Sequence, residues 1–196
     1  MVSWTGIVYR ATTYDVPLRV NPNRRAGRWN LAGRDCTQYF CLDAEAPHAE
    51  MLRAEELRTD AEASTFRTTL WQARVDEGAI VDYSTFERAE AAGFPAEALV
   101  EDDHERCQAE AERLKSFNVR GLLSASAALP GSVNLTLFGP RVQVDWSTTV
   151  QLASMLPVQR IAEGTAPSGL VARTRFHGQT HAGLAEYRAA QKRLFD

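Results

Sequence analysis

The sequence has little of what marks a disulfide-bonded or metal-binding protein. Among 196 residues there are three cysteines, Cys36, Cys41 and Cys107, and no pair has the spacing C-x-x-C. An odd number without that spacing predicts small buried thiols in a reducing compartment. The two histidines that are four residues apart, His177 and His181, lie among glycines rather than on a regular helix. We therefore predict no metal site.

Charge and hydropathy exclude two further classes of protein. The 25 acidic residues outnumber the 22 basic ones, and no segment forms a basic stripe, which argues against nucleic-acid binding. No apolar run approaches the roughly 18 residues that a membrane span needs. The first residues also lack the basic and apolar regions of a signal peptide. We expect a cytoplasmic protein that acts on neither nucleic acid nor membrane.

The order of predicted elements indicates an α+β fold. Hydrophobic content of 44% and charged content of 24% are ordinary for a globular chain of this length. Strands and helices do not alternate regularly, which argues against a doubly wound sheet. The patterns predict strands at 6–10, 37–42, 66–75, 78–82, 119–123, 134–138 and 142–146, and helices at 44–56, 84–92 and 102–115.

The last fifth of the chain has a different character. A short helix is predicted at 148–156, where Pro157 would stop it. A linker follows at 164–169, and then an edge strand at 170–176. The pattern of 182–195 predicts a terminal helix with Leu184, Tyr187 and Leu194 on one face.

The stretch from Tyr9 to Glu50 contains most of the side chains that could bind a ligand or take part in catalysis. It carries Tyr9-Arg10, Gly27-Arg28-Trp29-Asn30, Gln38-Tyr39-Phe40 and Glu50. Two guanidiniums can clamp a diphosphate with paired hydrogen bonds. An aromatic face can hold a flat base, and a carboxylate can stabilise a developing cation. Together these groups would suit cleavage of a dinucleotide at its glycosidic bond.

This stretch resembles the RES domain family, named for arginine, glutamate and serine, whose members are mostly bacterial toxins that consume NAD. A second block, Gly121–Ala127 followed by Asn134–Phe138, is similar to the family's second motif, in which a serine ends a buried strand. The resemblance implies an ADP-ribosyltransferase-like fold, a split β core with flanking helices. It also implies a catalytic domain at 1–150, with 151–196 as an extension packed on the same domain.

The resemblance implies a role for each matching residue. Glu50 would bond the ribose hydroxyls and favour positive charge at the anomeric carbon. Arg10 and Arg28 would bind the diphosphate, and Tyr39 would stack on nicotinamide or donate its hydroxyl. The implied catalytic residues are Glu50, Arg28, Tyr39 and Ser126, and the implied NAD-binding residues are Arg10, Arg28, Tyr39, Ser126 and Asn134.

Two of these assignments leave alternatives open. Ser126 would bond a phosphate or the glutamate, but it follows Ala125 where the family often has proline, so Ser124 competes with it. Asn134 could instead cap its strand or hold the serine loop. Trp29 is predicted to pack in the core, and a solvated loop is predicted to hold the neighbouring arginines Arg24, Arg25 and Arg34.

These residues predict an NAD-degrading toxin that cleaves the nicotinamide–ribose bond, with NAD as substrate and no metal. The resemblance alone implies a partner, a cognate helix-turn-helix antitoxin. The sequence leaves open whether water, phosphate or a protein side chain accepts the ribosyl group. One alternative is an ADP-ribosyltransferase that modifies a protein or a small metabolite. Another is a non-catalytic binding module whose terminal helix docks a partner or a second copy of the chain.

Overall fold

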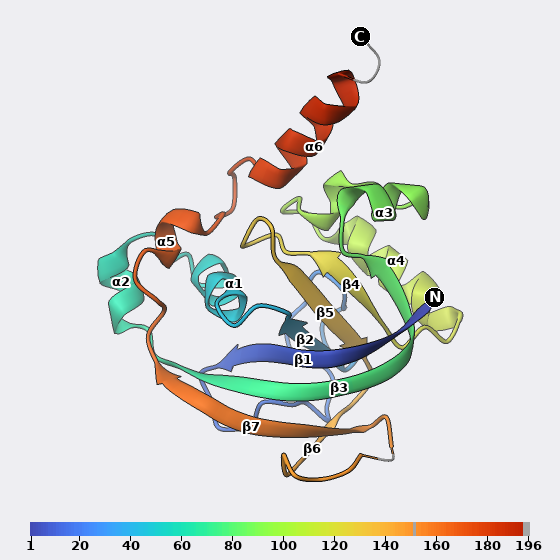
Figure 1. Ribbon diagram of the computed structural model, residues 1–196, viewed down its shortest axis with the longest axis vertical. Helices are drawn as coiled ribbons and strands as arrows, with labels where there is room; N and C mark the ends of the chain where they lie inside the picture. The colour runs from blue at the N-terminus through green and yellow to red at the C-terminus, as the bar shows by residue number, and fades with distance from the viewer. Residues whose placement is uncertain (151, 194–196) are drawn as a thin grey trace.

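A computed structural model describes residues 1–150 and 152–193, within which seven strands form one mixed sheet (Figure 1). The strands are β1 (Val2–Thr12), β2 (Thr37–Cys41), β3 (Thr68–Tyr83), β4 (Gly121–Ala125), β5 (Val133–Phe138), β6 (Val142–Val144) and β7 (Met155–Gly164). The helices are α1 (Ala46–Ala54), α2 (Asp60–Thr65), α3 (Phe86–Ala91), the 3-10 helix η1 (Glu97–Leu99), α4 (Glu105–Ser116), α5 (Leu170–Arg173) and α6 (Ala182–Arg193).

The sheet is split into two lobes that share its longest strand. β3 pairs antiparallel with β1 on one side and with β7 on the other. Its last residues, Ile80–Tyr83, leave β7 and pair parallel with β4, which continues through β5 to β2. β1 meets β2 only where Tyr9 lies opposite Cys41. The two lobes therefore diverge from β1 and β3, and this leaves room between them for a site.

The helices cover the lobes in two groups. Figure 1 shows α1, α2 and α5 on one side of the view and α3 and α4 on the other, while α6 projects from the top. The α3–α4 group packs on β4 through a cluster that includes Tyr83, Phe94 and Leu122. The α1 group packs on the chain after β7, where Leu52 contacts the cluster of Leu170 and Phe176. The C-terminal segment thus belongs to the packing around α1.

Local sequence explains where several of these elements begin. Thr59 and Glu62 form a capping box at the start of α2, and Thr85 accepts a hydrogen bond from Arg88 N at the start of α3. Helix α1 begins at Ala46, two residues later than predicted. Asp43 does not cap it, because its carboxylate accepts a hydrogen bond from Ser132 at 2.5 Å.

The two strands predicted at 66–75 and 78–82 are one strand, β3. The predicted break is a β-bulge, at which the register shifts between Trp4 opposite Glu77 and Val2 opposite Ile80. Ala79 has a left-handed φ of 53° there. A bulge adds a residue without ending the pairing, so the strand continues past it.

Two predictions in the C-terminal fifth were wrong. The described part of 148–156 contains no helix, and β7 begins at Met155. Pro157 lies inside β7, where it pairs with Val144 of β6 before pairing with β3 begins, so its missing N–H is tolerated. The predicted strand at 170–176 is the short helix α5 followed by extended chain. Leu170 and Phe176 are both buried against α1 rather than along a sheet edge.

The terminal helix is confirmed as α6, which starts at Ala182. Leu184 and Tyr187, which were predicted to share one face, are both partly buried against the α3–α4 cluster, while Leu194 and the predicted end at 195 lie outside the described residues. In the part of the chain that the structure describes, no helix is long and apolar enough to cross a membrane.

Candidate active site

A cavity of about 680 Å³ lies where β1, β2, the 13–29 loop and α1 meet. Its lining includes five of the six predicted site residues: Arg10, Arg28, Tyr39, Glu50 and Asn134. The sixth, Ser126, does not line it but bonds directly to Glu50. The competing serine, Ser124, does line the cavity. The structure thus gathers residues from both sequence blocks around one space.

Glu50 is held by two side chains from the second sequence block. Its Oε1 atom accepts hydrogen bonds from Ser126 Oγ at 2.8 Å and from Asn134 Nδ2 at 2.7 Å. Among the described residues, no donor is bonded to its Oε2 atom. One carboxylate oxygen is therefore fixed by the protein, and the other is left for a ligand.

Ser126 is bonded both to Glu50 and to the backbone of its own turn. Its Oγ accepts hydrogen bonds from the amides of Ala128 at 3.2 Å and Leu129 at 3.0 Å. A hydroxyl has one proton to donate, and Ser126 donates it to Glu50. The serine thus ties the carboxylate to the backbone of a tight turn.

Arg10 projects from β1 and is only 9% exposed. Its Nη1 donates to Gln38 Oε1 at 3.2 Å. Burial lowers the pKa of Arg10, while the nearby Tyr14 opposes that shift and Arg19 adds to it. A guanidinium has five N–H donors, so the bond to Gln38 leaves others for a ligand.

The turn that carries Arg28 is held in place by the hydroxyl of Tyr39. The Tyr39 hydroxyl accepts from Trp29 N at 2.9 Å and donates to Asn30 Oδ1 at 2.8 Å, and burial raises the pKa of Tyr39. A Cβ on Gly27 would lie 2.7 Å from Asn30 Oδ1 and 2.8 Å from the Tyr39 oxygen, so the turn requires glycine. The ring of Tyr39 lines the cavity while its hydroxyl supports the turn.

The side chain of Arg28 extends from the cavity lining to the 3-10 helix η1. Its Nη1 donates to the carbonyl of Ala98 in η1 at 3.1 Å. From α4, Gln108 also donates to the carbonyl of Gly27 at 3.0 Å. The Arg28 turn is thereby fixed to the α3–α4 group.

The cavity residues that the sequence analysis missed include Arg53, His104 and His177. Arg53 lies one helical turn after Glu50 and is only 4% exposed, so helical spacing on α1 could have found it. His104 and His177 come from distant segments and carry no local signal. Burial, together with nearby Arg28 and Arg53, lowers the pKa of His104 to about 4.

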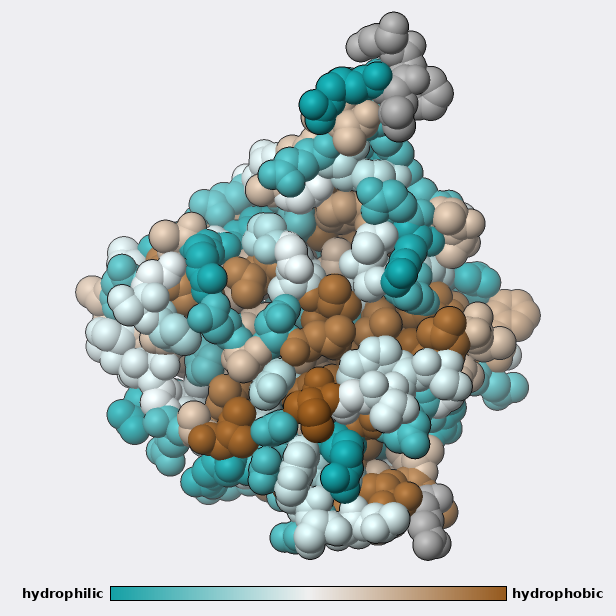
Figure 2. All heavy atoms as spheres, in the orientation of Figure 1, coloured by the Kyte–Doolittle hydropathy of each residue, from teal (hydrophilic) through white to brown (hydrophobic). Residues whose placement is uncertain are grey.

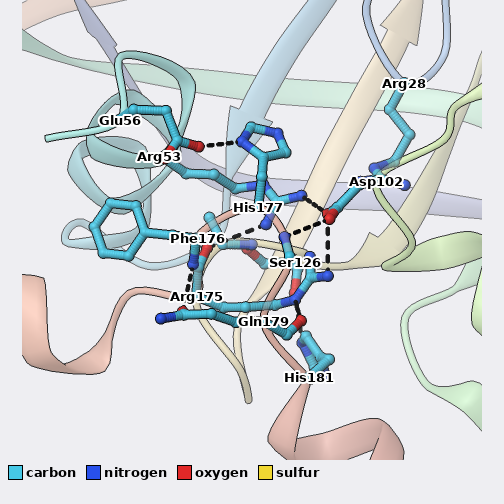
Figure 3. Close-up of polar contacts among 12 residues, drawn as sticks. Arg28, Arg53, Glu56, Asp102, Ser126, Arg175, Phe176, His177, Gln179 and His181 are labelled. Atoms are coloured by element: carbon cyan, nitrogen blue, oxygen red, sulfur yellow. Dashed lines mark hydrogen bonds and ion pairs between the residues drawn. The ribbon is translucent and has the colours of Figure 1, made fainter. Parts of the chain in front are cut away.

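Asp102 holds the cavity residue Arg53 and the chain next to the cavity residue His177 (Figure 3). Its Oδ1 accepts from Arg53 at 2.6 Å and from Arg175 at 3.0 Å, and its Oδ2 accepts from the amide of Gly178 at 2.7 Å. Burial alone would raise the pKa of Asp102, but the Gly178 amide and the two arginines lower it to about 2. His177 bonds Glu56 next to this network.

The residues that were predicted to lie near the site without a role in it differ in where the structure places them. Trp29 is 1% exposed and packs 5.9 Å from Phe94, which confirms its packing role, although part of it also reaches the cavity. Arg24 and Arg25 are exposed, as predicted, yet they line the cavity. Arg34 lies outside the cavity lining and pairs with Glu112 at 3.3 Å.

The cavity is positively charged although the whole chain carries −3. Its two carboxylates are Glu50 and Glu55, whereas its arginines are Arg10, Arg19, Arg24, Arg25, Arg28 and Arg53. A cleft lined mainly by one sign of charge attracts ligands of the other sign. The site therefore favours an anionic ligand. Among the described residues, no group of three or more histidine, cysteine, aspartate or glutamate side chains could hold a metal ion.

The RES domain family matches residues 7–153, so the chain belongs to the RES domain family. No curated protein matches the sequence. Among solved structures, the chain is similar to one from the M. tuberculosis MbcT–MbcA toxin–antitoxin complex, with 22% sequence identity and a TM-score of 0.64. That similarity covers 87% of this chain and 89% of the other. It confirms the predicted fold, an α+β fold of the ADP-ribosyltransferase type with a split β core and flanking helices.

Proposed function

We propose that this RES domain protein is a toxin that degrades NAD by cleaving the nicotinamide–ribose bond. The observation that carries the proposal is the fixed carboxylate of Glu50 in a cavity rich in arginine. A dinucleotide has a diphosphate for the arginines and a ribose for the carboxylate. Family membership supports the same substrate.

In this proposal Glu50 stabilises the cation that forms at the ribose. Cleavage of an N-glycosidic bond passes through an oxocarbenium-like state, as glycoside hydrolysis does. Nicotinamide leaves as a neutral base from a cationic precursor, so no strong general acid is required. Ser126 and Asn134 fix one oxygen of Glu50, so the carboxylate does not need to reorganise as charge develops.

Arg10 and Arg28 are proposed to bind the diphosphate. Arg10 is buried and held by Gln38, and Arg28 is held by the Ala98 carbonyl, so both guanidiniums are ordered before the ligand arrives. Preordered donors lose less conformational freedom on binding. Binding energy from the diphosphate can then be used to distort the reacting ribose. Tyr39 would contribute its ring face to nicotinamide, since its hydroxyl is bonded within the turn.

We divide the chain into a catalytic domain at 1–150 and an extension at 151–196 on the same domain. Two contacts support a role for the extension in the site: His177 lines the cavity, and Arg175 pairs with Asp102, which also pairs with the cavity residue Arg53. The proposed partner is a cognate antitoxin of the helix-turn-helix type that blocks this cavity. The similar solved structure is of a toxin–antitoxin complex, which supports a protein partner.

The proposal is tested by incubating the purified chain with NAD and measuring free nicotinamide, with and without inorganic phosphate. Release in either buffer supports NAD cleavage, and dependence on phosphate identifies the acceptor. NAD labelled in its adenylate part, added with a lysate, tests the alternative of ADP-ribosyl transfer to a protein. If NAD is still intact after hours in all three conditions, the proposal is wrong.

A further inference from the structure

A single buried histidine connects helix α6 to the turn that holds Glu50. His181 is 5% exposed and immediately precedes α6. Its Nε2 lies 3.1 Å from the carbonyl oxygen of Ser126, and its Nδ1 lies 3.2 Å from the amide nitrogen of Leu184 (Figure 3 shows His181 and Ser126). The same imidazole therefore contacts the serine loop and the first turn of the helix.

The two contacts define which nitrogen of the ring carries the proton. The amide of Leu184 can only donate, so Nδ1 must be the bare acceptor. The carbonyl of Ser126 can only accept, so Nε2 must carry the hydrogen. His181 is thus neutral, and it caps α6 through Nδ1 in the way that shorter polar side chains cap helices. Burial lowers the pKa of His181, and the nearby arginines, Arg175 foremost, lower it further, whereas the Ser126 carbonyl opposes the shift.

One further hydrogen bond links the contact with Ser126 to Glu50. The Ser126 carbonyl accepts from His181, and the Ser126 hydroxyl donates to Glu50 Oε1 at 2.8 Å. The same turn is held from the extension by Arg175 N, which donates to the carbonyl of Ala128 at 2.7 Å. The serine's orientation therefore depends on residues beyond 153, where the family match ends.

The other attachments of helix α6 are to α3 and η1. None of its residues is fully buried. Leu184 and Tyr187 pack on the α3–α4 cluster, Tyr187 donates to Glu90 at 2.6 Å, and Arg188 pairs with Glu90 at 2.6 Å and with Glu97. In Figure 2 it projects above the rest of the molecule with a largely hydrophilic surface. His181 is the buried point at which this projecting helix meets the site.

We propose that His181 is a positioning residue. It fixes Ser126 relative to helix α6, and Ser126 in turn fixes Glu50. This inference rests on the proposed role of Glu50 in NAD cleavage. A small shift of the Ser126 backbone would rotate its hydroxyl away from the carboxylate. Without that bond Asn134 would be the one remaining side-chain donor to Glu50 among the described residues, so the carboxylate would be held less firmly. Turnover would then fall, while substrate affinity, supplied by the arginines, would change little.

The two bonds of His181 can be removed separately. The amide of glutamine places its nitrogen near the position of Nε2, so His181→Gln keeps a donor for Ser126 and loses the helix cap. Asparagine is a good N-cap but is too short to reach the carbonyl, so His181→Asn keeps the cap and loses Ser126. His181→Phe retains the edge-on ring contact with Phe86 and loses both bonds. Arg173→Ala, which removes an exposed ion pair with Glu45 in the same segment, is the control.

The experiment measures amide hydrogen exchange and the kinetics of nicotinamide release in the full chain. His181→Asn and His181→Phe should speed exchange at Ala128 and Leu129 and lower kcat by about tenfold, with KM within about twofold, as loss of one well-placed hydrogen bond predicts. His181→Gln should speed exchange at Leu184 but keep kcat within about twofold of the wild type. Arg173→Ala should resemble the wild type in both measurements.

The proposal is overturned if His181→Asn keeps wild-type kcat and wild-type exchange at Ala128 and Leu129. It is also overturned if His181→Gln and His181→Asn lose kcat equally, since the effect would then not follow the Ser126 bond. If the wild type releases no nicotinamide, the proposed function fails instead. Exchange at Ala128 and Leu129 then decides alone whether His181 holds the serine turn.

Discussion

Ser126 donates its only hydroxyl proton to Glu50, although 76 positions separate the two residues in the chain. The serine oxygen also accepts two backbone amides, so it transmits the position of a rigid turn to the carboxylate. Asn134 bonds the same carboxylate oxygen from the neighbouring strand. In the proposed function the serine orients the carboxylate, and the second oxygen of Glu50 contacts the substrate.

Replacing Glu50 with glutamine should remove most of the activity while preserving the fold. Glutamine has the same shape, but it has no charge to stabilise a ribosyl cation. Turnover should fall by an amount equivalent to roughly 2–4 kcal/mol of barrier, the range for one preorganised electrostatic group. NAD affinity, measured by calorimetry, should change little. Glu87→Gln, an exposed carboxylate on α3, is the control, and full activity in Glu50→Gln would show that the site is assigned wrongly.

The two serines should respond differently to alanine. Ser126→Ala leaves the buried amide of Ala128 and the partly buried amide of Leu129 without their acceptor, so it should cost about 1–3 kcal/mol of unfolding free energy as well as turnover. Ser124 also lines the cavity, yet it has no side-chain hydrogen bond within the described residues. Its alanine variant should lose less of both. Denaturant unfolding and nicotinamide release measure the two effects, and a greater loss in Ser124→Ala would reverse the assignment.

Arg28→Ala should weaken NAD binding before it affects turnover. A charge-assisted contact to phosphate exists in the ground state and in the transition state, so its loss raises KM by an amount equivalent to about 1.5–3 kcal/mol. Arg34, in the same loop but 65% exposed and outside the cavity, provides the matched control through Arg34→Ala. Equal effects of the two substitutions would indicate nonspecific charge attraction instead of a bound diphosphate.

Gly27→Ala tests the support of the Arg28 turn. The added methyl group would lie within 3 Å of both Asn30 and the Tyr39 hydroxyl, so one of those partners must move. We expect a loss of about 1–3 kcal/mol in unfolding free energy, typical of overpacking, together with weaker NAD binding. Gly78→Ala has no atom within 4 Å and should leave both quantities nearly unchanged. A Gly27→Ala protein as stable as the wild type would show that the turn is adaptable.

The sequence predicted which residues gather at the cavity better than it predicted the C-terminal fold, for a physical reason. Glu50, Arg28 and Asn134 lie in motifs whose spacing is set by local turns, so the resemblance could assign them. The position of His177 depends on Asp102, Arg53 and the packing of Leu170 on α1, which are contacts between distant segments. Contacts of this kind cannot be predicted from the local pattern of the sequence.

The errors in secondary structure have related causes. Pro157 was expected to stop a helix, but it lies in β7, opposite Val144 and just outside the residues that pair with β3. The break between 75 and 78 was expected to separate two strands, but sheet pairing continues through the bulge at Ala79. In both places the strands on either side override the local preference of the chain.

The fold should lose stability on acidification before its carboxylates titrate. Burial is the first cause that lowers the pKa of three histidines, His48, His104 and His181, and His104 reaches about 4. Because their ordinary pKa is 6.5, the unfolded chain binds protons at a higher pH than the folded one. Their contribution is therefore complete above pH 6.5 and decreases as the pH falls toward 4. The carboxylate of Asp102, with its pKa lowered to about 2, contributes to the decline only below its ordinary value of 3.8.

Urea unfolding at pH 7, 6.5, 6 and 5 measures this dependence, because that interval lies above the ordinary pKa of Asp102, 3.8, and of Glu90, 4.5, both of which the fold lowers to about 2. The midpoint should decrease steadily below pH 6.5, and His104→Gln should make the decrease shallower by removing one of the three histidines. Glutamine keeps a polar side chain of similar length and cannot take up a proton. An unfolding midpoint that is constant from pH 7 to 5 would show that the histidines are not held neutral by the fold.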